Sequence, residues 1–222
     1  YYKLNDYEKA KKYFLMVLSN DPDFKDAQNK LGLSFTGLGD FNRAKVCYEK
    51  AIINTPNNAG PYFNLAIIFN QLGDYQKAIK NYEIVIRINP KFINAYSNLG
   101  TIYESLGNHD SAINQFKKMI EIAPTIATSY NKLASLYANL KDYNNARNFY
   151  KQAIEIDPNY VNAYNNLGVL YKNFNDFDKA KNTLEKGIEI NPDLTYLHNN
   201  LGLVFSSLGN YPKAINSFNT AI

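Results

Sequence analysis

The fold is decided by the stretch VNAYNNLGVLYKNFNDFDKAKNTLEKGIEINPDL, residues 161–194. In its first half, apolar or small residues recur at the three- and four-residue spacing of a helix, at Tyr164, Leu167, Gly168, Tyr171 and Phe174. The segment NFNDF is typical of a turn. A second helical stripe follows at Ala180, Leu184, Gly187 and Ile188, and NPD ends it. The stretch therefore predicts two helices joined by a short turn.

Three local details support the helix pair. Asp178 is placed to cap the second helix, because an Asp side chain can accept hydrogen bonds from the first free amides. Gly168 and Ala180 are small, which predicts that the two helix backbones approach closely at these positions. In a later segment, Pro212 occupies the first helical turn, where no amide donor is needed.

The same pattern repeats along the whole chain with a period of 34 residues. Turn segments GDF, GDY, KDY, NDF and GNY keep this spacing, with His109 replacing the aromatic residue in GNH. Two further columns hold the register without a gap: Pro22, Pro56, Pro90, Pro124, Pro158 and Pro192, and Ala10, Ala44, Ala78, Ala112, Ala146, Ala180 and Ala214. A fixed period of this length is the signature of a solenoid, in which each helix pair buries its stripes against its neighbours.

The repeat resembles the tetratricopeptide repeat (TPR) family over the full chain. Unit 93–126 supplies the motif residues Tyr96, Leu99, Gly100, Tyr103, Ala112, Phe116, Met119 and Pro124. It departs at Met119, as a later unit does at Gly187, where the family usually has Ala, and His198 stands for the first aromatic residue of its unit. The resemblance implies an all-α, right-handed superhelical solenoid of antiparallel helix pairs, with about thirteen helices and no strands. We expect one array over 1–222, as part of a longer protein: a partial unit 1–24, complete units 25–58, 59–92, 93–126, 127–160 and 161–194, and a nearly complete unit 195–222.

Composition excludes several classes of protein. The net charge of +4 is spread along the chain, whereas nucleic-acid and membrane surfaces need clustered Lys and Arg. A single cysteine, Cys47, excludes an internal disulfide. No apolar run reaches membrane-spanning length. We therefore expect a reduced, cytoplasmic setting.

The sequence holds no recognisable catalytic constellation. His109 and His198 fall in aromatic columns of different units, so we interpret both as packing residues. Cys47 has no histidine in its unit and is interpreted as a buried, inert thiol. The acidic pairs Asp21/Asp23 and Asp176/Asp178 fit helix capping better than metal binding. We expect no enzyme activity within these residues and no metal or cofactor.

The family resemblance implies where a ligand would bind: along a concave groove lined by the first helix of each pair. Polar residues of this chain that match groove positions are Asn29, Lys30, Asn64, Asn98, Thr101, Asn131, Lys132, Asn166, Asn199 and Asn200. A carboxylate clamp, as in chaperone adaptors, would need a lysine before Asn64 or Asn98 and an asparagine at Ile67 or Thr101. Because these are absent, we reject a clamp for the complete units.

The groove is more similar to the repeat arm of O-linked N-acetylglucosamine transferase, in which asparagines hold an extended peptide by its backbone. Asn64, Asn98, Asn166 and Asn200 occupy that column, and Lys30 and Lys132 interrupt it. An amide both donates and accepts, as a peptide unit does. The alternative is a solvated polar face produced by an asparagine-rich composition. If the column serves a ligand, its amides should have no partners within the chain.

These observations favour a non-catalytic scaffold that binds a protein or an extended peptide. Two alternatives remain open: a substrate-recruiting arm of a larger protein-modifying transferase, and a self-assembling scaffold. The chain stops at Ala221 and Ile222 without a polar capping helix. We therefore expect the stripe Leu208, Ala214, Phe218 and Ala221 to promote end-to-end contacts between copies.

Overall fold

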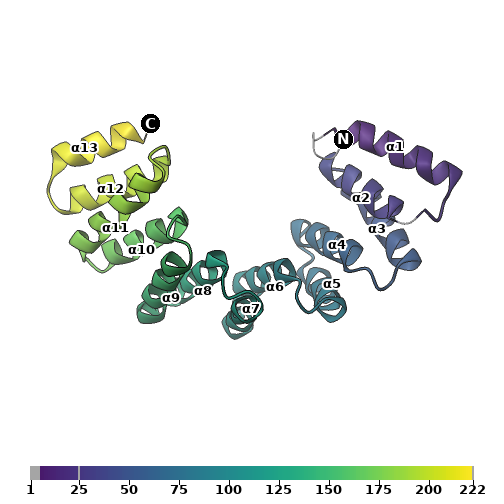
Figure 1. Cartoon of the computed structure of the whole chain (residues 1–222), viewed down its shortest axis with the longest axis horizontal. Helices are drawn as coiled ribbons and strands as arrows, with labels where there is room; N and C mark the ends of the chain where they lie inside the picture. The colour runs from purple at the N-terminus through teal and green to yellow at the C-terminus, as the bar shows by residue number, and fades with distance from the viewer. Residues whose placement is uncertain (1–5, 25, 222) are drawn as a thin grey trace. The chain divides into compact units, whose positions relative to one another are not determined.

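The computed structural model describes residues 6–24 and 26–221. Within this part of the chain there are thirteen helices and no strand, as predicted (Figure 1). The beginning of the partial unit 1–24 and the final Ile222 lie outside the described residues. The helices are α1 (Tyr7–Asn20), α2 (Ala27–Gly37), α3 (Phe41–Asn54), α4 (Ala59–Gln71), α5 (Tyr75–Ile88), α6 (Ile93–Ser105), α7 (His109–Ile122), α8 (Ala127–Asn139), α9 (Tyr143–Ile156), α10 (Val161–Asn173), α11 (Phe177–Ile190), α12 (Thr195–Ser207) and α13 (Tyr211–Thr220).

The chain divides into two compact units, residues 1–108 with α1–α6 and residues 109–222 with α7–α13. The division falls between α6 and α7, inside the repeat 93–126. Within each unit, every helix packs against the next helix in the chain. We call the even-numbered helices the first helices of their pairs and the odd-numbered helices the second helices.

Each unit has a hydrophobic core built from the predicted stripes. In unit 1 the core includes Ala44, Tyr48, Leu65, Tyr82 and Leu99, contributed by alternating first and second helices. In unit 2 the main cluster includes Ala146, Tyr150, Leu167, Leu184 and Leu201. The alanine column therefore lies in the core, as the 34-residue period predicted, whereas the aromatic column at the turn is only partly buried.

Close helix approach explains the glycine of the Leu-Gly motif. A Cβ atom added to Gly168 would lie 2.6 Å from Cγ of Leu184 and 3.5 Å from the backbone oxygen of Ala180. In the last pair, the same atom on Gly202 would meet the ring of Phe218 at 2.6 Å. A first helix therefore packs its backbone directly against a side chain of its own second helix.

The turn inside each pair needs a left-handed backbone residue. Glycine supplies it in four repeats, for example Gly209 with φ +73°. Lys141 (φ +62°) and Asn175 (φ +60°) take the same place in two repeats of unit 2. The second helix begins two residues after this left-handed residue, so the turn fixes the angle between the two helices.

The second helix is capped by the residue before it, which corrects one prediction. Asp176, rather than Asp178, accepts a hydrogen bond from the backbone N–H of Lys179 and is the N-cap of α11. Asp178 lies in the first helical turn, where its charge is favourable to the helix dipole. Pro212 lies in the first turn of α13, as predicted.

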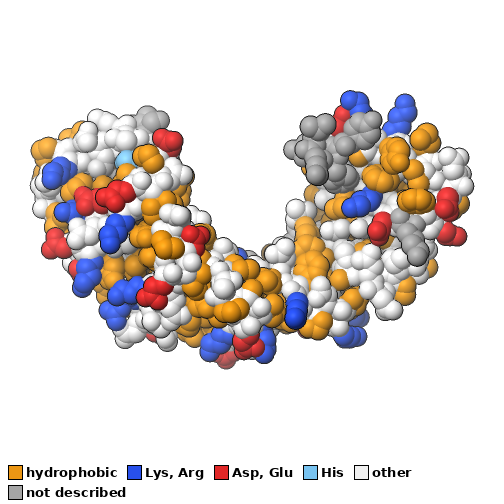
Figure 2. All heavy atoms as spheres, in the orientation of Figure 1, with side chains coloured by type: hydrophobic (Ala, Val, Ile, Leu, Met, Phe, Trp, Pro, Cys, Tyr) orange, Lys and Arg blue, Asp and Glu red, His pale blue; other side chains and the backbone are white. Residues whose placement is uncertain are grey.

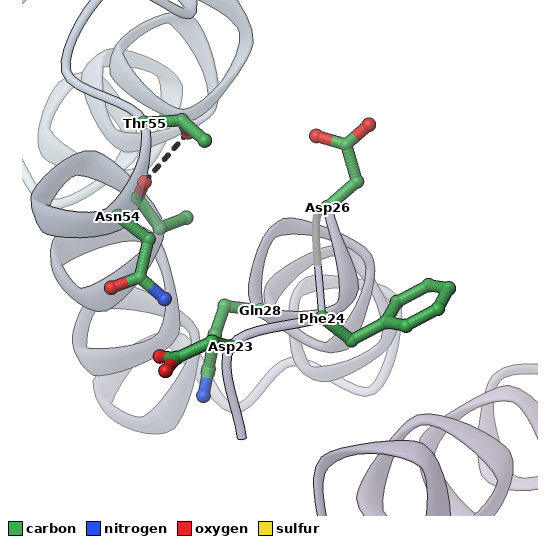
Figure 3. A pocket seen from close by; sticks show the side chains of 7 residues that line it. Asp23, Phe24, Asp26, Gln28, Asn54 and Thr55 are labelled. Carbon is green, nitrogen blue, oxygen red and sulfur yellow. Dashed lines mark hydrogen bonds between the residues drawn. The ribbon is translucent and has the colours of Figure 1, made fainter. Parts of the chain in front are cut away.

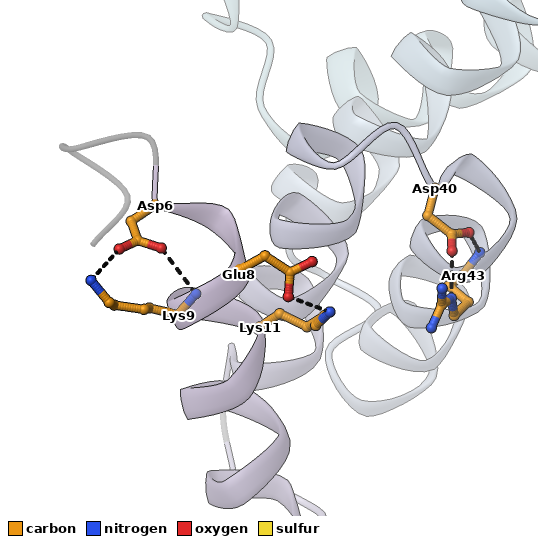
Figure 4. A network of polar contacts seen from close by, with 6 residues as sticks. All are labelled: Asp6, Glu8, Lys9, Lys11, Asp40 and Arg43. Carbon is orange, nitrogen blue, oxygen red and sulfur yellow. Dashed lines mark hydrogen bonds and ion pairs between the residues drawn. The ribbon is translucent and has the colours of Figure 1, made fainter.

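Capping carboxylates also form exposed ion pairs with residues three positions later. Figure 4 shows this at Asp6 with Lys9 and at Asp40 with Arg43, beside a Glu8–Lys11 pair. These contacts lie at the surface, where solvent screens them, so each contributes little to stability. Their role is to satisfy helix ends, not to form a binding site.

Candidate peptide-binding face

The first helices form one face of each unit. In unit 2, α8 contacts α10 and α10 contacts α12, whereas neighbouring second helices make fewer contacts with one another. The first-helix side is therefore the inner, more closely spaced side of the unit. The predicted site residues of unit 2 lie on these helices: Asn131, Lys132, Asn166, Asn199 and Asn200.

Asparagine side chains on neighbouring first helices form hydrogen bonds with each other. The Nδ2 group of Asn64 donates to Oδ1 of Asn29 at 3.0 Å, and Asn166 donates to Asn131 in the same way at 3.0 Å. Asn200 donates to Oδ1 of Asn165 at 2.7 Å. In all three pairs the partners are 35 residues apart, one more than the repeat.

In unit 2 these bonds join into a chain of four amides. Nδ2 of Asn165 donates to Oδ1 of Asn166 at 3.2 Å, which links the α10–α12 bond to the α8–α10 bond. The donors run in one direction, from Asn200 through Asn165 and Asn166 to Asn131. We call this set the amide chain. All four side chains lie at positions that are half-buried, so solvent and ligands still reach them.

Asn98 has a different partner because the repeat before it departs from the pattern. The residue 35 positions earlier is Phe63, which cannot accept a hydrogen bond. Nδ2 of Asn98 donates instead to the hydroxyl of Tyr82 at 3.0 Å. The prediction that the four column asparagines have no partners within the chain is therefore wrong for Asn64, Asn98, Asn166 and Asn200.

The other predicted site residues are distributed over the first helices. Lys30 and Thr101 are exposed, and the Thr101 hydroxyl donates to the backbone oxygen of Ser97. The ammonium group of Lys132 lies 5.9 Å from the ring centre of Phe116, a cation–π distance. Asn199 is exposed on α12.

A recess of about 390 Å³ opens between α8 and α10 beside the amide chain. Its lining includes Asn139, Asn166 and Asn173, together with Ser135 and the buried Tyr150. The hydroxyl groups of Ser135 and Tyr150 are 3.0 Å apart. Sequence reasoning missed this recess, although Asn139 and Asn173 are one repeat apart at the same helical position.

The two histidines lie in different surroundings. His109 is exposed at the start of α7, so its interpretation as a packing residue is wrong. His198 is half-buried, and its Nε2 lies 2.7 Å from the backbone oxygen of Pro192. Tyr96 and Tyr164 make the equivalent bond with their hydroxyl groups, to Pro90 and Pro158. Because a carbonyl oxygen only accepts, Nε2 of His198 carries the proton and the ring replaces a tyrosine.

The thiol of Cys47 is buried, and burial raises its pKa to about 11. It is therefore a protonated, unreactive thiol at neutral pH, as predicted.

A second recess lies in unit 1, where the segment before α2 faces the end of α3 (Figure 3). Its lining includes Asp23 and Asp26, whose carboxylates point in different directions. Nδ2 of Asn58 donates to the Asp26 carboxylate at 3.3 Å. Across the described residues there is no group of three His, Cys, Asp or Glu side chains that could hold a metal ion.

Charged side chains are mixed in sign on the surface that Figure 2 shows, within each unit. In the described part of the chain, no helix combines the length and the apolar character needed to cross a bilayer.

Comparison with solved structures shows the same fold in TPR proteins. MamA is 27% identical, with a TM-score of 0.61, over 73% of this chain and 89% of that chain. YrrB, a TPR protein with an unusual peptide-binding site, is 21% identical with a TM-score of 0.58, over 79% and 90%. The C-terminal part of a TPR repeat-containing protein from Cytophaga hutchinsonii is 18% identical with a TM-score of 0.78, over 99% and 90%. No curated protein sequence matches this chain.

Family profiles described as tetratricopeptide repeat match residues 1–24, 26–58, 47–80, 93–126, 125–193 and 195–222, and a profile described as TPR repeat matches 67–107. With the 34-residue period and the packed helix pairs, these matches establish that the chain belongs to the tetratricopeptide repeat family.

Proposed function

We propose that this chain is a non-catalytic scaffold that binds an extended peptide, or an extended segment of a protein, along its first-helix face. The observation that carries the proposal is the amide chain Asn131–Asn166–Asn165–Asn200, which runs across three consecutive first helices. It places peptide-like groups in a row on the inner face of unit 2.

The sequence-based condition that ligand-binding asparagines have no partners within the chain was too strict, because the internal bonds of the amide chain leave capacity for a ligand. An asparagine amide has two N–H groups and two oxygen lone pairs, and each inter-amide bond uses one N–H of the donor and one lone pair of the acceptor. The remaining groups match the N–H and C=O groups of a peptide backbone. Because neighbouring asparagines already hold one another in place, binding immobilises fewer free side chains.

The fold of the relatives supports the same use. YrrB, which has this fold, has a peptide-binding site according to its description. The inner face of a TPR stack is long and open, which suits a chain-like ligand better than a small molecule.

Backbone recognition predicts the character of the binding. Each new hydrogen bond is worth about 0.5–1.5 kcal/mol net, and ordering the peptide offsets part of this gain. We therefore expect a dissociation constant on the order of micromolar. Binding should tolerate many peptide sequences and depend weakly on salt, because few charges take part.

The test uses peptides captured by the parent protein from a displayed library and then measured by fluorescence anisotropy. The variant replaces the four asparagines of the amide chain, Asn131, Asn165, Asn166 and Asn200, with Ala. The matched control replaces four exposed asparagines of second helices, Asn42, Asn114, Asn148 and Asn182. All proteins are compared well below their melting temperatures, with helicity checked by circular dichroism.

The first variant should lose about thirtyfold or more in affinity, since four lost bonds amount to at least about 2 kcal/mol. The control should bind as the parent does. Equal affinity of all three proteins would contradict the proposal and leave the asparagines with a purely structural role.

A further inference from the structure

We propose that the recess between α8 and α10 is a side-chain pocket that selects a carboxylate, that of an Asp or Glu in the bound peptide. This inference rests on the proposed function, because the pocket opens beside the amide chain that would hold the peptide backbone. Asn166 belongs to both, since it bonds to Asn131 and also lines the recess.

Side chains that can donate hydrogen bonds line the pocket from two helices and a turn. Asn139 comes from α8, Asn166 and Asn173 come from α10, and each brings an NH₂ group. Lys141, in the turn after α8, brings an ammonium group. An ionised carboxylate only accepts hydrogen bonds, so it can accept from the N–H groups of this set that are not already engaged. Asn166, for example, donates one N–H to Asn131 and keeps a second.

Two hydroxyl groups of the lining add one more donor. Tyr150 is 3% exposed, and its hydroxyl lies 3.0 Å from Oγ of Ser135. Burial raises the pKa of Tyr150, so the phenol stays protonated at neutral pH. One of the two hydroxyls donates to the other, and the accepting hydroxyl has a hydrogen of its own that it can donate to a ligand oxygen.

The lining of the pocket carries a positive charge and no negative one. Lys141 is the only charged residue in its lining. The three first helices of unit 2, with Lys132 and Lys172, contain no Asp or Glu. Lys141 also lines a neighbouring recess, together with Asp142 and Asp176. The Asp142 carboxylate accepts hydrogen bonds from the backbone and side-chain amides of Asn145 at 3.2 and 2.7 Å, and the Asp176 carboxylate is paired with Lys179. Both acidic side chains have partners within the chain, so Lys141 is the charge of this lining that a carboxylate ligand would meet.

Lys141 has a backbone conformation that residues other than glycine rarely adopt. Its φ of +62° is the left-handed conformation that glycine adopts at this turn in four other repeats. In the next repeat the residue is Asn175, a type that tolerates this conformation. A lysine here is disfavoured by the backbone, which is consistent with a use for its side chain.

The turn also provides a matched pair of variants. Lys141→Gly removes the ammonium group and supplies the residue best suited to the backbone, so the protein should fold. Asn175→Gly makes the same change at the equivalent turn of the next repeat, outside the pocket lining.

The probes are three fluorescein-labelled ten-residue peptides of Ala, Ser and Thr that differ only in a central Glu, Gln or Lys. We expect the parent protein to bind the Glu peptide about tenfold more tightly than the Gln peptide, and the Lys peptide most weakly. The preference for Glu should weaken as salt increases, because it is electrostatic. In Lys141→Gly it should fall to about twofold, and in Asn175→Gly it should stay near tenfold.

Two failures are distinguishable. If all three peptides bind the parent equally, or if Lys141→Gly keeps the full preference, the pocket is contradicted while peptide binding stands. If none of the peptides binds the parent at protein concentrations up to about a millimolar, well above the expected range, the proposed function is overturned and the pocket with it.

Discussion

Nδ2 of Asn166 donates a 3.0 Å hydrogen bond to Oδ1 of Asn131, a residue one position further back than the repeat period predicts. The contact therefore joins non-equivalent positions of neighbouring repeats. Asn64 with Asn29 and Asn200 with Asn165 show the same offset. The asparagines that recur on first helices thus form bonds between repeats as well as a polar face.

The Asn131–Asn166 bond should stabilise unit 2 measurably. In a double-mutant cycle with Asn131→Ala and Asn166→Ala, the coupling free energy should be about 0.5–1.5 kcal/mol. Urea unfolding of the parent, the two single variants and the double variant measures it. Asn131→Ala combined with Asn182→Ala, an exposed change on α11, should be additive. A coupling near zero for the bonded pair would show that the bond adds no stability.

Gly168→Ala should destabilise the protein although Ala favours helices. The new Cβ would lie 2.6 Å from Cγ of Leu184, which is fully buried and cannot move away freely. Overpacking costs about 1–3 kcal/mol, more than the gain in helix propensity of about 1 kcal/mol. The cost should shrink when Leu184 is first replaced by Ala, because the smaller side chain leaves room. Equal costs in both backgrounds, measured by urea unfolding, would mean that the contact is not the cause.

His198→Tyr should preserve stability, whereas His198→Phe should lower it by about 1 kcal/mol. Nε2 of His198 lies 2.7 Å from the backbone oxygen of Pro192, where other repeats place a tyrosine hydroxyl. A tyrosine can restore this bond and a phenylalanine cannot. Thermal melting at pH 8 compares the three proteins, and equal melting temperatures for Tyr and Phe would argue against a role for the bond.

Stability should fall at high pH because of buried tyrosines. Burial raises the pKa of Tyr82 to about 12, above the value near 10 of an exposed tyrosine. The folded state therefore holds this proton more tightly, so its contribution is complete below about pH 10 and is lost between about pH 10 and 12. Urea unfolding at pH 8, 10 and 11 should show a decline in the parent that is smaller in Tyr82→Phe. An equal decline in both would assign the effect to other groups.

Much of the fold follows from columns of the sequence. Corresponding positions in successive repeats have similar environments. The repeat period alone therefore predicted that Ala146 and Leu167 lie in the core and that a turn precedes Asp176. The exceptions are local. The aromatic column at the turn packs only partly, and its substitution by His109 lies exposed.

The site was predicted less completely than the fold. Aligning the repeats identified the face that carries Asn166 and Asn200. The alignment compares residues that are 34 positions apart, however, whereas the hydrogen bonds join residues that are 35 positions apart. Which side chains meet depends on how neighbouring helices pack, and the repeat period of the sequence carries no information about that packing. The recess that includes Ser135 and Lys141 depends on the same packing, because it gathers residues from two helices of one pair, their turn and the next first helix.

The central claim is that the amide chain contacts the peptide. Its most direct test is nuclear magnetic resonance of the ¹⁵N-labelled protein, following the side-chain amide signals of assigned asparagines during titration with a captured peptide. We expect the signals of Asn131, Asn165, Asn166 and Asn200 to shift together, with one midpoint, while those of the exposed second-helix asparagines Asn42, Asn114, Asn148 and Asn182 stay in place. Shifts confined to the second-helix asparagines, with the amide chain unchanged at saturating peptide, would contradict the account.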